Sequence, residues 1–236
     1  MLAARIVPTI LMKRRMQVKG VGFKADRVVG NALQAARIHA MRQVDELLIL
    51  DVSATAEGRE PDYDMITELT RSTFTPVTVG GGITELDQVQ KLLESGADKV
   101  CIGSAYGLIS QIAERFGSQC VSVALDVHVL IKGDPTQIVM MAKTIEDLGA
   151  GELLLQSVPR DGTMDGYDLN LIAAVSRSVS IPVVASGGCS GYLDMENALQ
   201  AGADAVAAGA LFLFTDATPG KAAEYLNNRN VEVRIA

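Results

Sequence analysis

The chain has little of what several protein classes depend on. Its 236 residues include no Trp, 4% aromatic residues, three cysteines and seven prolines. Cys101, Cys120 and Cys189 lie far apart and form no C-x-x-C pair, so the sequence predicts neither a disulfide framework nor a zinc site. We therefore expect reduced thiols, as in the cytoplasm, and neither a metal nor a cofactor.

Long apolar runs and excess positive charge are also missing. The longest apolar stretch, residues 205–214, is too short to span a bilayer. The basic run at 13–15 follows the apolar N-terminal segment, which reverses the order of a signal peptide. The net charge of -7 provides no electrostatic footprint for nucleic acid or a membrane surface. We expect a cytoplasmic protein that binds neither.

A duplication is the clearest feature that is present. TPVTVGGGI at 75–83 returns as IPVVASGGC at 181–189, and GADKVCIGSA at 96–105 returns as GADAVAAGAL at 202–211. DELLILD at 45–51 is answered by GELLLQS at 151–157. All three pairs share an offset of 106 residues, as from Gly81 to Gly187. Short apolar runs alternate with helical periodicity throughout, the pattern of parallel βα units.

These patterns predict an α/β fold: a (β/α)8 TIM barrel built from two duplicated half-barrels, as a single domain over residues 1–236. Eight strands are predicted at residues 5–10, 47–51, 77–79, 100–102, 121–126, 153–157, 183–185 and 205–208. The helices predicted between them include 31–42, 63–73, 85–95, 137–148, 169–178 and 193–201. Connections are short, and the chemistry of such a barrel takes place at the carboxyl ends of its strands.

Glycine clusters follow corresponding strands of the two halves. They are Gly80 to Gly82 after the third strand, Gly187 and Gly188 after the seventh, and Gly103-Ser104 and Gly209-Ala210 after the fourth and eighth. Glycine loops at helix N-termini let backbone N–H groups approach an anion closely. Two clusters therefore predict a ligand with two phosphates, and the alternative is that the glycines only permit tight turns.

Motifs along almost the whole chain resemble the cyclase subunit of imidazole glycerol phosphate synthase. They are RIVP (5–8), VKG (18–20), DELLILD, VTVGGGI, GADKV, FGSQ (116–119), AGELLL, RDGT (160–163), GYD (166–168) and SGG. The resemblance implies a lyase of histidine biosynthesis that uses ammonia from a glutaminase subunit to split a doubly phosphorylated ribonucleotide. It also implies one phosphate site at Gly82 and Ser104 and another at Gly188, Gly209 and Ala210.

The resemblance further implies two catalytic aspartates, at the ends of the first and fifth strands, and only one is present. Aligning RIVPTIL with CVSVALD places Leu11 opposite Asp126. Leucine transfers no proton, and losing one positioned acid or base costs about 10²- to 10⁴-fold. We expect Asp126 to be catalytic, although an Asp at a strand end often caps the next segment. The connection at 128–137 is also shorter than in the family.

Four further residues near the strand ends or in helices need interpretation. Lys19, expected in the first βα loop, and Asp51 match substrate-contacting residues of the family, but an ordinary solvated lysine is an equal alternative for Lys19. His128 is a candidate replacement proton shuttle, although a lone His near a strand end is more often structural. His39 falls in the middle of a predicted helix and suggests no function.

Charged residues stand at the N-terminal starts of four strands, and we call Arg5, Glu46, Lys99 and Glu152 the floor quartet. Pointing inward, they would form a neutral ring that closes the barrel floor. The residues alone fit a stabilising plug. The resemblance implies instead an ammonia gate, beneath which the glutaminase docks at the N-terminal face, with Asp98 on the side presented to it.

The retained gate and the lost aspartate together suggest a paralogue. Family members without the first aspartate resemble subunits that supply ammonia for acetamidino modification of nucleotide-linked sugars in surface polysaccharides, and TILMK and ATAEGREPDY are similar to that group. We predict a heterodimeric subunit that accepts ammonia and binds a phosphorylated small molecule. A true cyclase with a substitute acid and a non-catalytic glutaminase activator remain alternatives. A sister isomerase is disfavoured, because it too needs the first aspartate and lacks the quartet.

Overall fold

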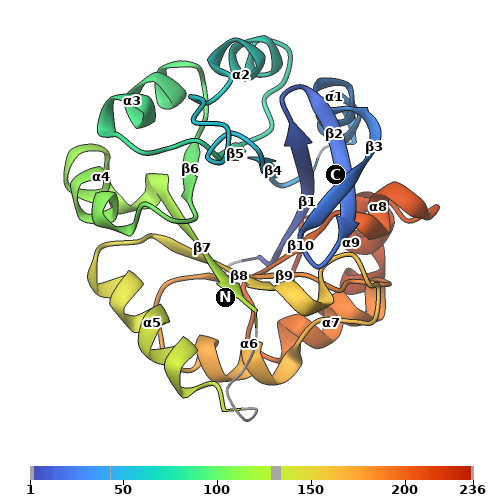
Figure 1. Cartoon of the computed structure of the whole chain (residues 1–236). Helices are drawn as coiled ribbons and strands as arrows, with labels where there is room; N and C mark the ends of the chain where they lie inside the picture. The colour runs from blue at the N-terminus through green and yellow to red at the C-terminus, as the bar shows by residue number, and fades with distance from the viewer. Residues whose placement is uncertain (1–2, 43, 129–133, 235–236) are drawn as a thin grey trace.

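A closed barrel forms the centre of the molecule (Figure 1). The computed structural model describes residues 3–42, 44–128 and 134–234. In these ranges ten strands form one sheet in the order β10-β9-β8-β7-β6-β5-β4-β1-β2-β3, and β10 also pairs with β1, which closes the barrel. Its eight parallel strands are β1 (Arg5–Lys13), β4 (Leu47–Asp51), β5 (Val77–Gly80), β6 (Lys99–Ile102), β7 (Val121–Val127), β8 (Glu152–Ser157), β9 (Val183–Ser186) and β10 (Ala205–Ala208). The predicted (β/α)8 barrel and all eight of its strands are confirmed.

Helices follow the strands around the outside of the barrel (Figure 1). They are α1 (Ala32–Met41), α2 (Tyr63–Thr70), α3 (Leu86–Glu94), α4 (Ile109–Phe116), α5 (Thr136–Asp147), α6 (Leu169–Ser176), α7 (Tyr192–Gln200), α8 (Ala210–Phe214) and α9 (Pro219–Asn227). The helix predicted at 63–73 ends early, because the Ser72 hydroxyl donates to the Leu69 carbonyl and the Thr70 hydroxyl reaches the Ser95 carbonyl. In the described part of the chain, no helix is both long and apolar enough to cross a membrane.

The largest departure from the predicted fold follows β1. Strand β1 runs on to Lys13, and β2 (Met16–Val21) and β3 (Lys24–Asn31) form an antiparallel hairpin where a short loop was expected. Gly22 and Phe23, the two residues between these strands, have φ of 59° and 64°. Positive φ at both central residues is typical of the type I′ turns that join hairpin strands. The expected loop position of Lys19 is therefore wrong, because this residue lies on β2.

Side chains of the barrel strands alternate between two cores. One set fills the inside of the barrel with mainly small or branched residues: Val7, Leu48, Cys101, Ala124, Leu154, Val184, Ala205 and Ala207. The other set, which includes Ile6, Ile10, Leu47 and Ile49, packs against the helices. This filling agrees with the low aromatic content, since barrel interiors are mostly packed with branched aliphatic residues.

The duplication reappears in the pairing register of the strands. In the first half, neighbouring strands pair Leu11 with Leu50, Leu50 with Gly80, and Gly80 with Cys101. In the second half, they pair Asp126 with Gln156, Gln156 with Ser186, and Ser186 with Ala207. We call these the first-half series (Leu11, Leu50, Gly80, Cys101) and the second-half series (Asp126, Gln156, Ser186, Ala207). The two halves thus present equivalent positions to the same end of the barrel.

Candidate active site

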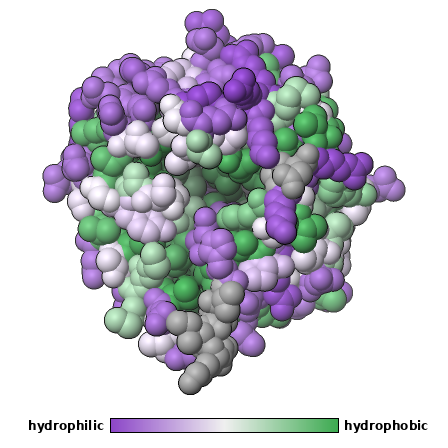
Figure 2. Space-filling model, viewed as in Figure 1, coloured by the Kyte–Doolittle hydropathy of each residue, from purple (hydrophilic) through white to green (hydrophobic). Residues whose placement is uncertain are grey.

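A cavity of about 360 Å³ opens at the carboxyl ends of the barrel strands. This volume is within the range of small-molecule sites, about 300–1,000 Å³. Figure 2 shows the hollow near the middle of this face, with apolar residues around it. Most of the upper-face residues singled out in the sequence lie at this cavity: Leu11, Lys19, Asp51, Gly82, Ser104, Asp126, Gly188, Gly209 and Ala210 all line it.

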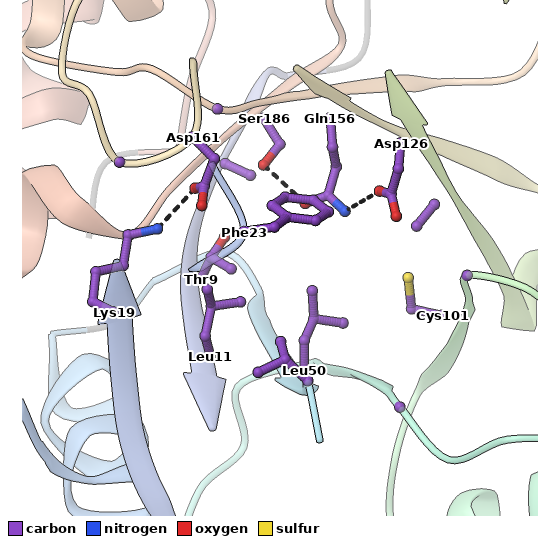
Figure 3. A pocket seen from close by; sticks show the side chains of 18 of the residues that line it. Thr9, Leu11, Lys19, Phe23, Leu50, Cys101, Asp126, Gln156, Asp161 and Ser186 are labelled. Atoms are coloured by element: carbon purple, nitrogen blue, oxygen red, sulfur yellow. Dashed lines mark hydrogen bonds and ion pairs between the residues drawn. The ribbon is translucent and has the colours of Figure 1, made fainter. Parts of the chain in front are cut away.

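The two sides of the cavity differ in polarity. Figure 3 shows Leu11 and Leu50 on one side and Asp126, Gln156 and Ser186 on the other. The Gln156 amide donates to Asp126 Oδ1 over 2.8 Å, and the Ser186 hydroxyl donates to Gln156 Oε1 over 3.4 Å. Neither Gln156 nor Ser186 was identified from the sequence. The repeat itself carried a signal, because Gln156 occupies the position of Leu50 and Ser186 that of Gly80.

Asp126 is the acidic residue of the polar side. Burial raises the pKa of its carboxyl above the ordinary value, and the Gln156 hydrogen bond and the charge of His128 only partly oppose this. Helix α5 begins at Thr136 with Pro135 at its N-cap, so Asp126 does not cap the following helix. A half-buried carboxyl with a raised pKa that faces a cavity is suited to accept and return a proton.

Lys19 is buried and paired. Its side chain is 7% exposed, and its Nζ lies 2.8 Å from Asp161 Oδ1, so the alternative of a solvated lysine is wrong. The backbone reinforces this contact, because the Gly22 N–H donates to the Asp161 carbonyl over 2.9 Å. Asp161 also lines the cavity, but sequence reasoning missed it, although it belongs to the RDGT motif.

Besides lining the cavity, the Asp51 carboxylate holds the backbone of the loop that follows β4. Its Oδ1 accepts hydrogen bonds from the backbone N–H groups of Ser53 and Ala54 over 3.0 and 3.1 Å, which hold the loop after β4. Arg59, a second residue that the sequence did not indicate, lies 3.1 Å from Asp51 Oδ2. The substrate contact implied by the resemblance stays a prediction for Asp51.

The glycines divide into two groups. A Cβ on Gly81 or Gly188 would lie 2.1 Å from a carbonyl oxygen of Asp51 or Gly166, so close backbone packing accounts for these two. A Cβ on Gly103 would meet nothing within 4 Å, because Gly103 borders the open cavity. Gly209 is the N-cap of α8, whose first residue is Ala210. Backbone N–H groups at such a helix start are suited to bind a phosphate, and the two phosphate sites stay predictions.

Thr9 presents an unused polar group to the site. Its Oγ1 is buried and has no hydrogen-bond partner among the described residues, and Thr9 lines the cavity. Buried polar groups are nearly always paired, so an unpaired one here is available to a ligand. In the sequence, Thr9 was noted only as the first residue of TILMK, which gave no sign of an unpaired hydroxyl.

The two histidines differ in their surroundings, and neither has an assigned role. His128 is exposed and packs edge-on to Phe23, with ring centroids 6.3 Å apart, and it is not among the described residues that line the cavity. His39 is mostly buried near Phe212, and burial lowers its pKa to about 4. Of the shortened connection at 128–137, residues 129–133 lie outside the described part of the chain.

The floor quartet points into the other end of the barrel, as the ring hypothesis required. Arg5 contacts Glu46 and Glu152, each over 2.5 Å, and Lys99 contacts the same two carboxylates over 2.9 and 3.1 Å. Burial raises the pKa of Glu152, but Arg5 and Lys99 outweigh it and the net pKa is lowered. The Thr78 hydroxyl also donates to Glu46 over 2.5 Å. Sequence reasoning missed Thr78, although its place in VTVG between outward-facing valines was a signal.

Asp98 lies beside the floor quartet at the same end of the barrel. Its Oδ2 accepts a hydrogen bond from the Val77 N–H over 2.8 Å. Its repeat equivalent, Asp204, accepts from the Val183 N–H over 2.9 Å. The structure therefore assigns both aspartates a task at strand starts, and the partner contact implied for Asp98 stays a prediction.

The structure is a (β/α)8 barrel with a cavity of small-molecule size at the carboxyl ends of its strands and a charged floor. The chain belongs to the histidine biosynthesis protein family, whose model matches residues 5–218. It is 41% identical over 253 aligned residues to the imidazole glycerol phosphate synthase subunit HisF of Bacillus cereus, with both chains covered completely. It is 40% identical over 251 residues to the HisF subunit of Dictyoglomus thermophilum, again over the whole of both chains.

Proposed function

We propose that this protein is an ammonia-accepting barrel subunit that works with a glutaminase and acts on a phosphorylated small molecule. The observation that carries the proposal is how the two ends of the barrel are built. At the floor, the four side chains of the quartet form salt bridges with one another. Above them, the cavity has polar side chains on one wall and leucines on the opposite wall. HisF relatives at 40 to 41% identity are subunits of a synthase, which supports a partner-dependent role. The resemblance assigns the glutaminase to the N-terminal face of the barrel, below the quartet.

Ammonia suits the path between the floor and the cavity. The interior between them is lined by apolar side chains such as Val7, Ala124 and Ala205. Such a lining does not stabilise an ammonium ion, because an unpaired charge is costly to bury, whereas ammonia is small and carries no net charge. Opening the salt bridges of Arg5 and Lys99 is therefore the step that would admit it.

At the upper end, Asp126 acts as the proton acceptor. When the ammonia nitrogen adds to a carbonyl carbon of the ligand, the C=O π bond breaks as the C–N bond forms, and the carbonyl oxygen takes up a proton from the ligand or from water. The nitrogen loses a proton to Asp126 Oδ2, while Oδ1 stays bonded to Gln156. Lys19 supplies a positive charge near the ligand, and backbone N–H groups around Gly82, Ser104, Gly188, Gly209 and Ala210 hold its phosphates. Leu11 takes no part in proton transfer, so any acid must come from the ligand or from water.

The favoured reaction is the supply of ammonia for amidation of a nucleotide-linked sugar in surface polysaccharide biosynthesis. Its support is Leu11, which removes one carboxylate of the pair that the cyclase reaction uses. The cyclase reaction itself, imidazole glycerol phosphate synthesis in histidine biosynthesis, is the second candidate, because identity of about 40% to HisF subunits extends over whole chains. A non-catalytic activator of glutaminase is the third.

Two assays separate these candidates. The barrel is mixed with its cognate glutaminase and glutamine hydrolysis is measured with and without it, using a Lys99→Met variant as the comparison. Stimulation by the wild-type barrel supports a partner-dependent role, and its absence contradicts both the ammonia-supply and the activator functions. Turnover of the cyclase ribonucleotide with ammonium salt and no glutaminase would instead favour the cyclase.

A further inference from the structure

We propose that Gln156 is a positioning residue that fixes the orientation of the Asp126 carboxylate and is itself held by Ser186. The three residues come from consecutive parallel strands, β7, β8 and β9. The value of this arrangement for catalysis rests on the proposed function, but the arrangement itself can be tested without it. Figure 3 shows the three side chains in one row along the cavity wall.

Strand register brings these side chains together. Asp126 pairs with Gln156 and Gln156 pairs with Ser186, and all three belong to the inward-facing set of their strands. Neighbouring strands lie about 4.8 Å apart, so inward side chains at paired positions meet directly. The Gln156 amide then spans from Asp126 Oδ1 at 2.8 Å to Ser186 Oγ at 3.4 Å.

The chemistry of the three groups fixes the direction of each hydrogen bond. An ionised carboxylate only accepts, so the Gln156 NH₂ must face Asp126 and its carbonyl must face Ser186. Ser186 then donates its hydroxyl proton to that carbonyl, which prevents the amide from turning over. Gln156 is 8% exposed, so water competes little for either bond. Asp126 Oδ1 is thereby occupied, and Oδ2 is left to receive a proton.

The same row also sets the proton affinity of Asp126. Burial of the carboxyl raises its pKa, and the hydrogen bond from Gln156 lowers it again in part. Without the Gln156 N–H donor, less would counteract the effect of burial, and the pKa of Asp126 would rise further. The hydrogen bond from Gln156 therefore favours the ionised form of this half-buried carboxyl and holds it toward the cavity.

The first-half series is an internal control for this inference. Leu50 and Gly80 occupy the positions of Gln156 and Ser186, and Leu11 that of Asp126. A Cβ on Gly80 would lie 2.7 Å from Leu50 Cδ2, so the same contact between strands exists there without any polar group. A change at Leu50 thus alters packing at the matching position but leaves the row of hydrogen bonds intact.

The test is a carboxyl-carbon NMR titration of Asp126 in the complete barrel, with Asp126→Asn used to assign the resonance. Gln156→Met keeps the length of the side chain but has no donor, so we expect a higher pKa of Asp126 than in the wild type. Ser186→Ala leaves the Gln156 amide free to turn over, so it should raise the pKa of Asp126 by less than Gln156→Met does. Ser186→Thr keeps the hydroxyl and should give the wild-type pKa of Asp126. Leu50→Met, the matched control, should leave the pKa unchanged.

Several outcomes would overturn the proposal. An unchanged pKa of Asp126 in Gln156→Met would do so, as would equal shifts in Gln156→Met and Leu50→Met, since the effect would then be general loosening. Failure of Ser186→Thr to restore the value would remove Ser186 from the row. A cooperative urea unfolding transition with the wild-type midpoint, followed by circular dichroism, shows that each variant is folded, and a variant that fails this check is replaced by the Ser186 pair. If the wild-type barrel does not stimulate the glutaminase, the proposed function is contradicted, but the results of these titrations are not affected.

Discussion

The two halves of the barrel have the same backbone register but different chemistry at the cavity. In the second-half series, Asp126, Gln156 and Ser186 form a hydrogen-bonded row. In the first-half series, Leu11 and Leu50 present only methyl groups. Because both series pair in the same order, the difference comes from side chains alone. Duplication has therefore preserved the architecture, while the side chains of the two cavity walls have become polar on one side and apolar on the other.

At the floor, the two halves have kept the same glutamate, although Arg5 and Lys99 both come from the first half. Glu46 and its repeat equivalent Glu152 each contact both Arg5 and Lys99. Removing one of these carboxylates would leave the two cations short of a partner in a mostly buried place, which is costly. A residue that faces the open cavity carries no such constraint. Substitutions in the floor quartet therefore destabilise the fold, whereas side chains of the cavity wall can differ between reactions without this cost.

The largest expected effect comes from removing the carboxylate of Asp126, on the polar side of the cavity. Asp126→Asn keeps the shape and can still accept from Gln156, but it takes up no proton. We expect product formation by the barrel and its glutaminase to fall by about 10²- to 10⁴-fold, with little change in binding of inorganic phosphate. Leu11→Asn, the change at the matching position of the other wall, serves as the control. An equal loss in both variants would contradict the assignment of proton transfer to one wall.

The floor provides the second comparison, because Glu46 and Glu152 share the same two cations and should respond in the same direction. Glu46→Leu and Glu152→Leu should each lower the free energy of unfolding by about 3–5 kcal/mol, with the larger loss for Glu46, which also accepts from Thr78. Urea unfolding followed by circular dichroism measures both. Thr78→Val, which removes one hydrogen bond but no charge, should cost about 1 kcal/mol. Wild-type stability in both Glu variants would show that the quartet is not a structural closure.

The carboxylates at the two ends of the barrel should respond to pH with opposite signs. The lowered pKa of Glu152 stabilises the fold above the unfolded-state pKa, and this stability is lost as the pH falls through the folded value. The raised pKa of Asp126 makes its ionised form a cost to the fold at neutral pH, and this cost disappears in acid. Asp126→Asn should therefore be more stable than the wild type at pH 7, with the advantage shrinking as the pH is lowered. Urea unfolding of both proteins, from pH 7 down to acidic pH, measures this difference in the free energy of unfolding. A difference that does not change with pH would contradict the raised pKa of Asp126.

The smallest expected effect is a gain of cyclase activity in Leu11→Asp. The substitution places a carboxylate opposite Asp126, but we expect less than about one hundredth of the rate of a cyclase relative, because the shortened connection after Asp126 also changes the cavity rim. Turnover of the cyclase ribonucleotide with ammonium salt measures it. Rates similar to those of the relatives would show that Leu11 alone separates this chain from the cyclases.

Much of the fold followed from local patterns. Strand positions were correct because parallel barrel strands are short apolar runs between helical segments, and eight such runs appear in the sequence. The hairpin after β1 was missed because its turn depends on positive φ at Gly22 and at Phe23, and Phe23 is not a residue that signals such a turn. Helix α4 was also missed, although Ile109 and Ile112 have helical spacing.

The candidate site was predicted in position but not in its contacts. Asp126 and Lys19 were identified from strand ends and motifs, and both line the cavity. Their partners were not identified, because Gln156 lies on β8 and Asp161 in the loop after it, and only pairing in the folded barrel brings them close. Thr9 was missed for the same reason, whereas Thr78 carried a local signal, because it lies between the outward-facing Val77 and Val79.

The sequence by itself determined the barrel, its duplication and the position of Leu11 opposite Asp126 in the repeat, because each is written in residue order and repeat spacing. Only the tertiary structure decided that Gln156 bonds to Asp126, that Lys19 is buried against Asp161, and that the floor quartet is closed. Such contacts join residues far apart in the chain. Their existence depends on strand register and on which face of a strand a side chain occupies, and both are established only when the barrel closes.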